Sequence, residues 1–261
     1  LAASRPVWVD ADRPLPTTGR DLMLLIDISG SMRTMDFTRE GEPLDRLTAV
    51  KRVAGEFIEN RTGDRLGLVL FGARPYLRAP LSFDRKAIGA LADEAEIALA
   101  GEYTAIGDAI GLAVRRLREL EAETRVIVLL TDGANNEGAV SPRQAADLAA
   151  EEGVRIYTIG VGGRETAAPN PYGIWSAKGA ARLEREILEE VAGRTGGSYF
   201  HVLDAEGLSR AYAEIDRLEP ALGADLREYT AIALYPWPLA AALALGALLV
   251  FRRGRVRRGR G

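Results

Sequence analysis

Short apolar runs alternate along this chain with segments of helical periodicity. Four runs have the length and composition of buried strands: DLMLLIDI (21–28), RLGLVLF (65–71), RVIVLLT (125–131) and RIYTIGV (155–161). Between these runs, apolar side chains recur every three or four residues, as in Leu47–Ile58 and Ile106–Leu120, which predicts helices with one apolar face. This alternation is typical of an α/β fold in which a doubly wound, mostly parallel sheet carries helices on both faces.

The remaining elements are predicted at the edges of this sheet and late in the chain. Residues 76–81 follow the second run after a short connection that contains Pro75, which predicts one antiparallel edge strand. Residues 198–202 predict a late strand at the opposite edge. Ser141 and Pro142 have the residue types of a helix cap and a first helical turn. Two further helices are expected at 183–192 and 205–218.

The composition excludes several classes of protein. The 261 residues are 47% hydrophobic and 27% charged, enough for a core in one large domain or two small ones, so disorder is excluded as the main state. The chain has no cysteine and a single histidine, His201, which excludes thiolate metal sites and argues against a multi-histidine centre. We expect His201 to be structural. Oxygen atoms remain as the candidate metal ligands.

The C-terminal segment joins a long uncharged stretch to a basic end. Residues 229–251, YTAIALYPWPLAAALALGALLVF, are long enough to cross a hydrocarbon core of about 30 Å as a helix. Six of the last ten residues are arginines, as in a cytoplasmic flank, so the folded body is expected outside the cytoplasm. A buried core helix is the alternative. The expected division is an extended lead-in (1–19), a folded domain (20–218), a linker (219–230), a transmembrane helix (231–251) and a basic cytoplasmic tail (252–261).

The charge of the body argues against nucleic acid as a partner. Without the six terminal arginines, 28 basic residues face 37 acidic ones, a formal charge of −9. A nucleic-acid-binding domain needs positive charge spread over a folded face, and this acidic body does not offer it.

Polar side chains gather where the predicted strands end. Asp27, Ser29 and Ser31 follow the first strand at alternating positions, and Asp132 follows the strand 125–131. Ligands of open parallel sheets bind at the carboxyl ends of the strands, and the loop before the helix at 106 adds the hydroxyl of Thr104. Two carboxylates and three hydroxyls, with water filling the remaining positions, suit a hard divalent cation such as Mg²⁺. Capping of the strand ends is the alternative role for each aspartate taken alone.

These residues resemble the metal-ion-dependent adhesion site of the von Willebrand factor A (VWA) domain family. The motifs are D-x-S-x-S at Asp27, Ser29 and Ser31, T-x-x-G from Thr104, and T-D-G with Asp132. Over residues 20–218 the resemblance implies a Rossmann-like VWA fold that binds a protein partner through Mg²⁺ or Mn²⁺ without catalysis. The partner is expected to supply an acidic side chain to the metal.

Three segments resemble, more narrowly, the bacterial aerotolerance (Bat-type) membrane proteins: DLMLLIDISGSMRTMDF, YTAIGDAIGLAV and TGGSYFHVLDAEGL. The resemblance implies a bacterial cell-membrane protein that works with a MoxR-type AAA+ ATPase and with other VWA membrane proteins.

Four side chains outside the motifs are candidates for partner contact. Glu102 lies beside Thr104, and Met32 follows the serine pair at the predicted loop 33–46. Tyr172 and Trp175 lie in the loop 162–179, and aromatic side chains are enriched at interfaces. The alternatives are a solvated charge for Glu102, packing over the sheet edge for Met32 and a loop plug for the aromatic pair.

Two other functions compete with a binding module. A Mg²⁺-dependent hydrolase or phosphotransferase would use Asp27 as its nucleophile, but a second acid is expected close by for proton transfer, and Ser29 and Ser31 stand there instead. A structural membrane scaffold with a vestigial site is the third possibility.

Overall fold

The computed structural model describes residues 7–8, 20–39, 42–61, 63–119, 122, 124–132, 135–162, 177–219 and 232–233. For 7–8, 38–39, 177–183 and 232–233 it describes the backbone alone. The chain forms two compact units, residues 1–15 with 226–261 and residues 16–225. In the first unit, β1 (Val7–Trp8) pairs antiparallel with β10 (Ile232–Ala233). The second unit contains the main sheet.

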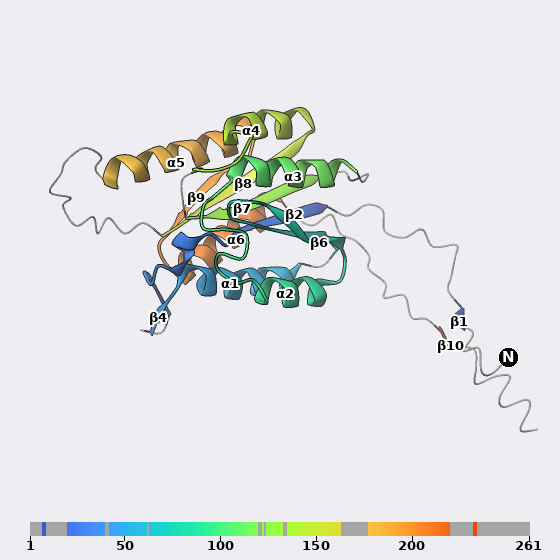
Figure 1. The fold of residues 1–261 in the computed structure, drawn as a ribbon. Helices are drawn as coiled ribbons and strands as arrows, with labels where there is room; N and C mark the ends of the chain where they lie inside the picture. The colour runs from blue at the N-terminus through green and yellow to red at the C-terminus, as the bar shows by residue number, and fades with distance from the viewer. Residues whose placement is uncertain are drawn as a thin grey trace, which may run out of the picture. The chain divides into compact units, whose positions relative to one another are not determined.

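The main sheet has six strands and is parallel except at one edge (Figure 1). From edge to edge the order is β6 (Tyr76–Ser82), β5 (Arg65–Phe71), β2 (Asp21–Asp27), β7 (Arg125–Thr131), β8 (Val154–Val161) and β9 (Tyr199–Val202). β6 is antiparallel to β5, and every other pair is parallel. The predicted mostly parallel sheet with an antiparallel edge strand is therefore confirmed. β2 is central, and the chain proceeds from it first to β5 and later to β7 on its other side.

Helices cover both faces of this sheet (Figure 1). On one face lie α1 (Arg46–Asn60), α2 (Arg85–Asp93) and α6 (Ala205–Leu218); on the other lie α3 (Ile106–Arg118), α4 (Pro142–Glu151) and α5 (Ala177–Arg194). Side chains of a strand alternate between faces, so Leu24 and Ile26 of β2 join the first core, and Met23 and Leu25 join the second. All seven residues of β2 are buried, which explains its continuous apolar run.

Some elements differ from their prediction. The predicted loop 33–46 contains a hairpin of β3 (Phe37–Arg39) and β4 (Glu42–Leu44), which Phe37 anchors with a fully buried ring. Its first residue, Arg33, is the last residue of a short 3-10 helix, η2 (Gly30–Arg33). α2 was not predicted. α4 begins as predicted, with Ser141 and Gln144 forming a reciprocal capping box.

The predicted transmembrane helix, 231–251, lies outside the described residues except for Ile232–Ala233, which form β10. Among the helices that the structure describes, none is both long enough and apolar enough to cross a bilayer.

Candidate metal centre

Asp27 and Asp132 lie at the ends of two neighbouring strands. Asp27 is the last residue of β2, Asp132 directly follows β7, and the register pairs Ile26 with Leu130. The loop after Asp27 turns back to Asp132, because Ser31 Oγ donates a 2.6 Å hydrogen bond to Asp132 Oδ1. The hydroxyls of Ser29 and Ser31 are 3.1 Å apart. The structure therefore brings the D-x-S-x-S loop and the second aspartate together.

The carboxylate of Asp27 is buried and doubly hydrogen-bonded. It is 0% exposed, Oδ1 accepts from the Ser29 backbone N–H at 2.8 Å, and Oδ2 accepts from Thr131 Oγ1 at 2.6 Å. Burial and, secondarily, the negative charge of Asp132 raise the pKa of Asp27 to about 7, although the bonds from Ser29 and Thr131 act to lower it. A bound cation would stabilise the ionised form of such a buried carboxylate, which burial and the neighbouring acid disfavour.

The loop with Thr104 is held between the other two loops. The Gly30 backbone N–H donates to Glu102 O at 3.1 Å, which joins it to the D-x-S-x-S loop. On the other side, the Thr104 backbone N–H donates to Asn136 Oδ1 at 2.8 Å, and the Asn136 N–H donates to Thr104 O at 3.1 Å. Thr104 is 3% exposed. The geometry thus places all five predicted oxygen-bearing residues on three interlocked loops.

Asn135 and Asn136 are positioning residues that the sequence motifs did not reveal. Asn135 Oδ1 accepts from the Ile106 N–H at 2.7 Å, in place of a side-chain cap from Ala105 at the start of α3. Together with the bonds of Asn136, this fixes the loop of Thr104 to the segment after Asp132. The only signal in the sequence is a pair of asparagines close behind T-D-G.

Arg46 is the second residue that the motifs did not reveal. At the first position of α1, its Nη1 donates to Asp132 Oδ2 at 2.7 Å and its Nε donates to Asp36 Oδ1 at 2.9 Å. Burial acts to lower the pKa of Arg46, but the bonds with Asp36 and Asp132 outweigh it and raise the pKa above the ordinary value. The arginine is therefore a fixed positive charge beside Asp132.

The donor set fits a hard cation. Asp27 and Asp132 could offer carboxylate oxygens, and Ser29, Ser31 and Thr104 could offer hydroxyls, the ligand types that Mg²⁺ and Mn²⁺ prefer. In the described part of the chain no three histidine, cysteine or acidic residues form a group that could hold a metal. A metal centre here therefore depends on the hydroxyls as well as on the two carboxylates.

The four candidate contact residues have different outcomes. Glu102 is exposed and forms a two-bond ion pair with Arg33, at 2.9 and 3.1 Å. The prediction that Met32 contacts a partner is wrong, because its side chain is 0% exposed and packs in the core, while Met35 is 59% exposed. Tyr172 and Trp175 lie outside the described residues.

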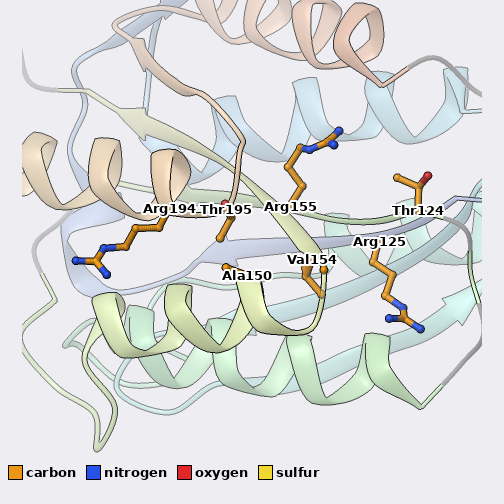
Figure 2. A pocket seen from close by; sticks show the side chains of 8 residues that line it. Thr124, Arg125, Ala150, Val154, Arg155, Arg194 and Thr195 are labelled. Atoms are coloured by element: carbon orange, nitrogen blue, oxygen red, sulfur yellow. The ribbon is translucent and has the colours of Figure 1, made fainter.

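A pocket at the opposite edge of the sheet is not a competing anion site. It lies at the starts of β7 and β8 and the C-terminal ends of α4 and α5 (Figure 2). Its three guanidinium groups point in different directions, and helix C-termini repel anions. Arg155 pairs with Glu219, and Arg194 pairs with Asp147 and Glu190. The charges of Arg155 and Arg194 are therefore compensated by acidic side chains of the protein.

His201 lies in β9 with contacts that are structural in kind. Its Nε2 is 2.9 Å from Gly162 O, and its Nδ1 is 3.0 Å from Arg185 Nη2. These contacts agree with a structural histidine.

The comparisons with known proteins give the family. The model of the von Willebrand factor type A domain matches residues 21–213, and the chain belongs to this family. An uncharacterized protein of Borreliella burgdorferi is 30% identical over 208 residues, which cover 78% of this chain and 60% of that protein. The chain thus spans about three fifths of this relative.

Solved structures place the fold beside bacterial membrane proteins. An aerotolerance-related membrane protein of Bacteroides fragilis has a TM-score of 0.63 and 26% identity over 76% of this chain and 98% of that one. BatB of Bacteroides thetaiotaomicron has a TM-score of 0.58 and 27% identity, with the same coverages. Proximal thread matrix protein 1 of the mussel byssus, with zinc in its MIDAS motif, shares the fold at 23% identity and a TM-score of 0.55, over 77% of this chain and 46% of that one.

Proposed function

We propose that this VWA domain is a metal-dependent binding module whose cation captures an acidic side chain of a protein partner. Its Mg²⁺ or Mn²⁺ ligands are Asp27, Ser29, Ser31, Thr104 and Asp132. The observation that carries the proposal is the contact of Ser31 Oγ with Asp132 Oδ1 at 2.6 Å, beside the Ser29 hydroxyl. This contact joins the carboxyl ends of β2 and β7. The strand order reverses at this place, because the chain passes from β2 to β5 on one side and later to β7 on the other. Open α/β sheets bind their ligands at such a switch point.

The chemistry of the donors supports capture of an acid. Hydroxyls are neutral ligands, so two carboxylates at most cancel the charge of a divalent cation, and Arg46 reduces the negative charge of Asp132 further. Such a cation keeps affinity for a carboxylate from outside. VWA domains serve in general as interaction modules, and the zinc in the MIDAS motif of the mussel protein is a precedent for a cation on this fold.

Exposed apolar side chains support a partner surface around the site. Leu99 and Tyr103 are 62% and 59% exposed in the loop that leads to Thr104, and Met35 is 59% exposed beyond η2. The Gly30–Glu102 and Ala98–Ile28 backbone bonds hold the two loops side by side. An acidic residue flanked by apolar ones is the partner segment that suits this rim.

The module is proposed to act as a binding protein and not as an enzyme. The residues at alternating positions after Asp27 are Ser29 and Ser31, whose hydroxyls bind a cation but transfer protons poorly, whereas an aspartyl nucleophile is served by an acid at such a position.

The proposed location is the bacterial cell membrane, with residues 231–251 as the anchor and the domain outside the cytoplasm. The uncharged stretch, its arginine-rich flank and the description of the Bacteroides fragilis structure as a membrane protein support this location. The resemblance to Bat-type proteins makes a MoxR-type AAA+ ATPase and other VWA membrane proteins the partners to test first.

Partner capture tests the function. The full chain, immobilised, is expected to retain such partners from membrane extracts in Mg²⁺ and to release them in EDTA. Asp27→Asn keeps the side chain's size but removes its charge, so it is expected to abolish Mg²⁺-dependent capture. Glu119→Gln, which removes an exposed carboxylate that pairs with Arg116 on the surface of α3, is the matched control. Capture that persists unchanged in EDTA would refute the proposed function.

A further inference from the structure

Arg46 reaches from the start of α1 to the candidate metal centre. Its side chain is 12% exposed, and that of its partner Asp132 is fully buried. A charge pair so well shielded from solvent acts on its neighbours with little screening. Arg46 therefore contributes to the electrostatics of the site in a way that an exposed arginine does not.

The guanidinium is held firmly in place. Nε and Nη2 both bond to the carboxylate of Asp36, a two-bond arrangement that fixes the plane of the group. Gly162, with φ of +85°, leaves room for it, because a Cβ there would lie 2.4 Å from Arg46 Nε. Only a glycine at 162 accepts both that backbone conformation and that approach.

The two oxygens of Asp132 have different partners. Oδ1 accepts from Ser31, and Oδ2 accepts from Arg46. The first oxygen thus lies on the side of the serines, and the second is occupied by the guanidinium. Asp132 can offer Oδ1 to a cation, directly or through water, while Oδ2 remains bound to the arginine.

A charge count shows what Arg46 changes. Asp27, Asp36 and Asp132 carry three formal negative charges, and Glu184, which interacts electrostatically with Asp132 and Arg46, carries a fourth. Arg46 contributes one positive charge, which leaves three, and a divalent cation reduces that number to one. Without the arginine the site would carry one more negative charge, would bind the cation more tightly, and would repel an incoming carboxylate.

We propose that Arg46 is a positioning residue that keeps Asp132 Oδ2 occupied and trades affinity for the cation against affinity for the partner's acid. The proposal rests on the proposed function and adds a determinant outside the motif residues. It makes a directional statement: removing the positive charge strengthens metal binding and weakens carboxylate binding. A residue that only supported the structure of the site would weaken both when it was removed.

The test is a titration of the full chain with Mn²⁺ alone, followed by electron paramagnetic resonance and calorimetry. Arg46→Gln is expected to lower the Kd for Mn²⁺ about tenfold, as for one unit charge a few ångströms away in a partly screened site. Acetate is then added to the Mn²⁺-loaded protein, and water-proton relaxation reports its binding. We expect the Kd for acetate to rise about tenfold in Arg46→Gln.

Three variants make the result specific. Arg46→Lys keeps the charge and is expected to restore the wild-type Mn²⁺ affinity to within about threefold. Asp36→Asn removes one negative charge from the other side of Arg46, so Mn²⁺ should bind more weakly. Arg217→Gln makes the same charge change on an exposed side chain of α6 and should alter neither affinity.

The outcomes separate this inference from the proposed function. Opposite shifts of the two affinities in Arg46→Gln support it, provided that circular dichroism shows the native fold. Unchanged or weaker Mn²⁺ binding in folded Arg46→Gln, or stronger binding in Asp36→Asn, overturns it while the metal site itself stands. A wild-type chain that binds no Mn²⁺ overturns the proposed function and this inference together.

Discussion

Asp27 is the residue at which the folded state carries an electrostatic cost. Its carboxylate is fully buried, close to Asp132, and stabilised by hydrogen bonds from Ser29 and Thr131. Desolvation outweighs those bonds, so the pKa is raised from 3.8 to about 7. The native protein without metal therefore holds a proton on Asp27 at pH values where the unfolded chain has lost it.

This difference in proton binding predicts a pH dependence of stability. In EDTA, the contribution of Asp27 to the free energy of unfolding should fall as pH rises from about 4 to about 7, by at most about 1.4 kcal/mol per pH unit, and should then level off. The sign follows because the native state binds the additional proton in that window. Urea unfolding of the wild type and of Asp27→Asn, between pH 4 and 8, measures it.

The comparison with Asp27→Asn isolates this group, because other titrations are common to both proteins. The difference in stability between the two should shift in favour of the variant as pH rises. A difference that does not change with pH would show that Asp27 has an ordinary pKa in the folded state.

The sequence predicted the motif residues of the site but not the residues that surround them. Spacing alone suggested that Asp27, Ser29 and Ser31 converge, because alternate residues after a strand face one way. The role of Arg46 could not be predicted from spacing, because its contact with Asp132 depends on how α1 packs and on the space left at Gly162. Such contacts depend on tertiary packing, and no local pattern encodes them.

At the scale of elements, the start of α3 is where a secondary structure and the site depend on each other. Gly107 is the glycine of T-x-x-G, and a Cβ there would lie 1.9 Å from Val140 O, a backbone atom. Gly111, one turn further along the same helix, has no atom within 4 Å of such a Cβ. The two glycines therefore differ in their structural role. Gly107 allows the helix to pack closely against the backbone at Val140, and Gly111 has no packing role.

We predict opposite effects of alanine at these positions. Gly111→Ala should raise the free energy of unfolding by about 0.5–1 kcal/mol, because alanine is the better helix former. Gly107→Ala should lower it by about 2 kcal/mol, because the backbone at Val140 must shift. Thermal or urea unfolding of both variants measures the pair, and stabilisation by Gly107→Ala would contradict the packing argument.

Element prediction succeeded where burial imposes a strong pattern. The four central strands are buried on both faces and gave continuous apolar runs within one residue of their observed bounds. α2 was missed because it buries only Ile88 and Ala92 in nine residues, too few for a visible apolar stripe. The β3–β4 hairpin was missed because its strands have three residues each and depend on the buried ring of Phe37.

At the scale of the VWA domain, the candidate metal centre lies at the carboxyl ends of the strands, and the two ends of the domain, Arg20 and Glu219, lie at their amino ends. Arg20, directly before β2, bonds to Asp64 and to the carbonyl oxygen of Glu219, which directly follows α6. Both ends of the domain are thus fixed together at the amino-terminal edge of the strands. Asp27 lies at the other end of β2, at the carboxyl-terminal edge of the strands.

The central claim concerns where the cation binds, and anomalous X-ray diffraction from Mn²⁺-soaked crystals of this protein locates it most directly. The account predicts one strong anomalous peak within coordination distance, about 2.2 Å, of oxygens from both the Asp27–Ser31 loop and the Asp132 or Thr104 loops, directly or through one water. Mn²⁺ bound only elsewhere, or no peak at saturating Mn²⁺ in crystals whose carboxyl-terminal sheet edge is open to solvent, would contradict it.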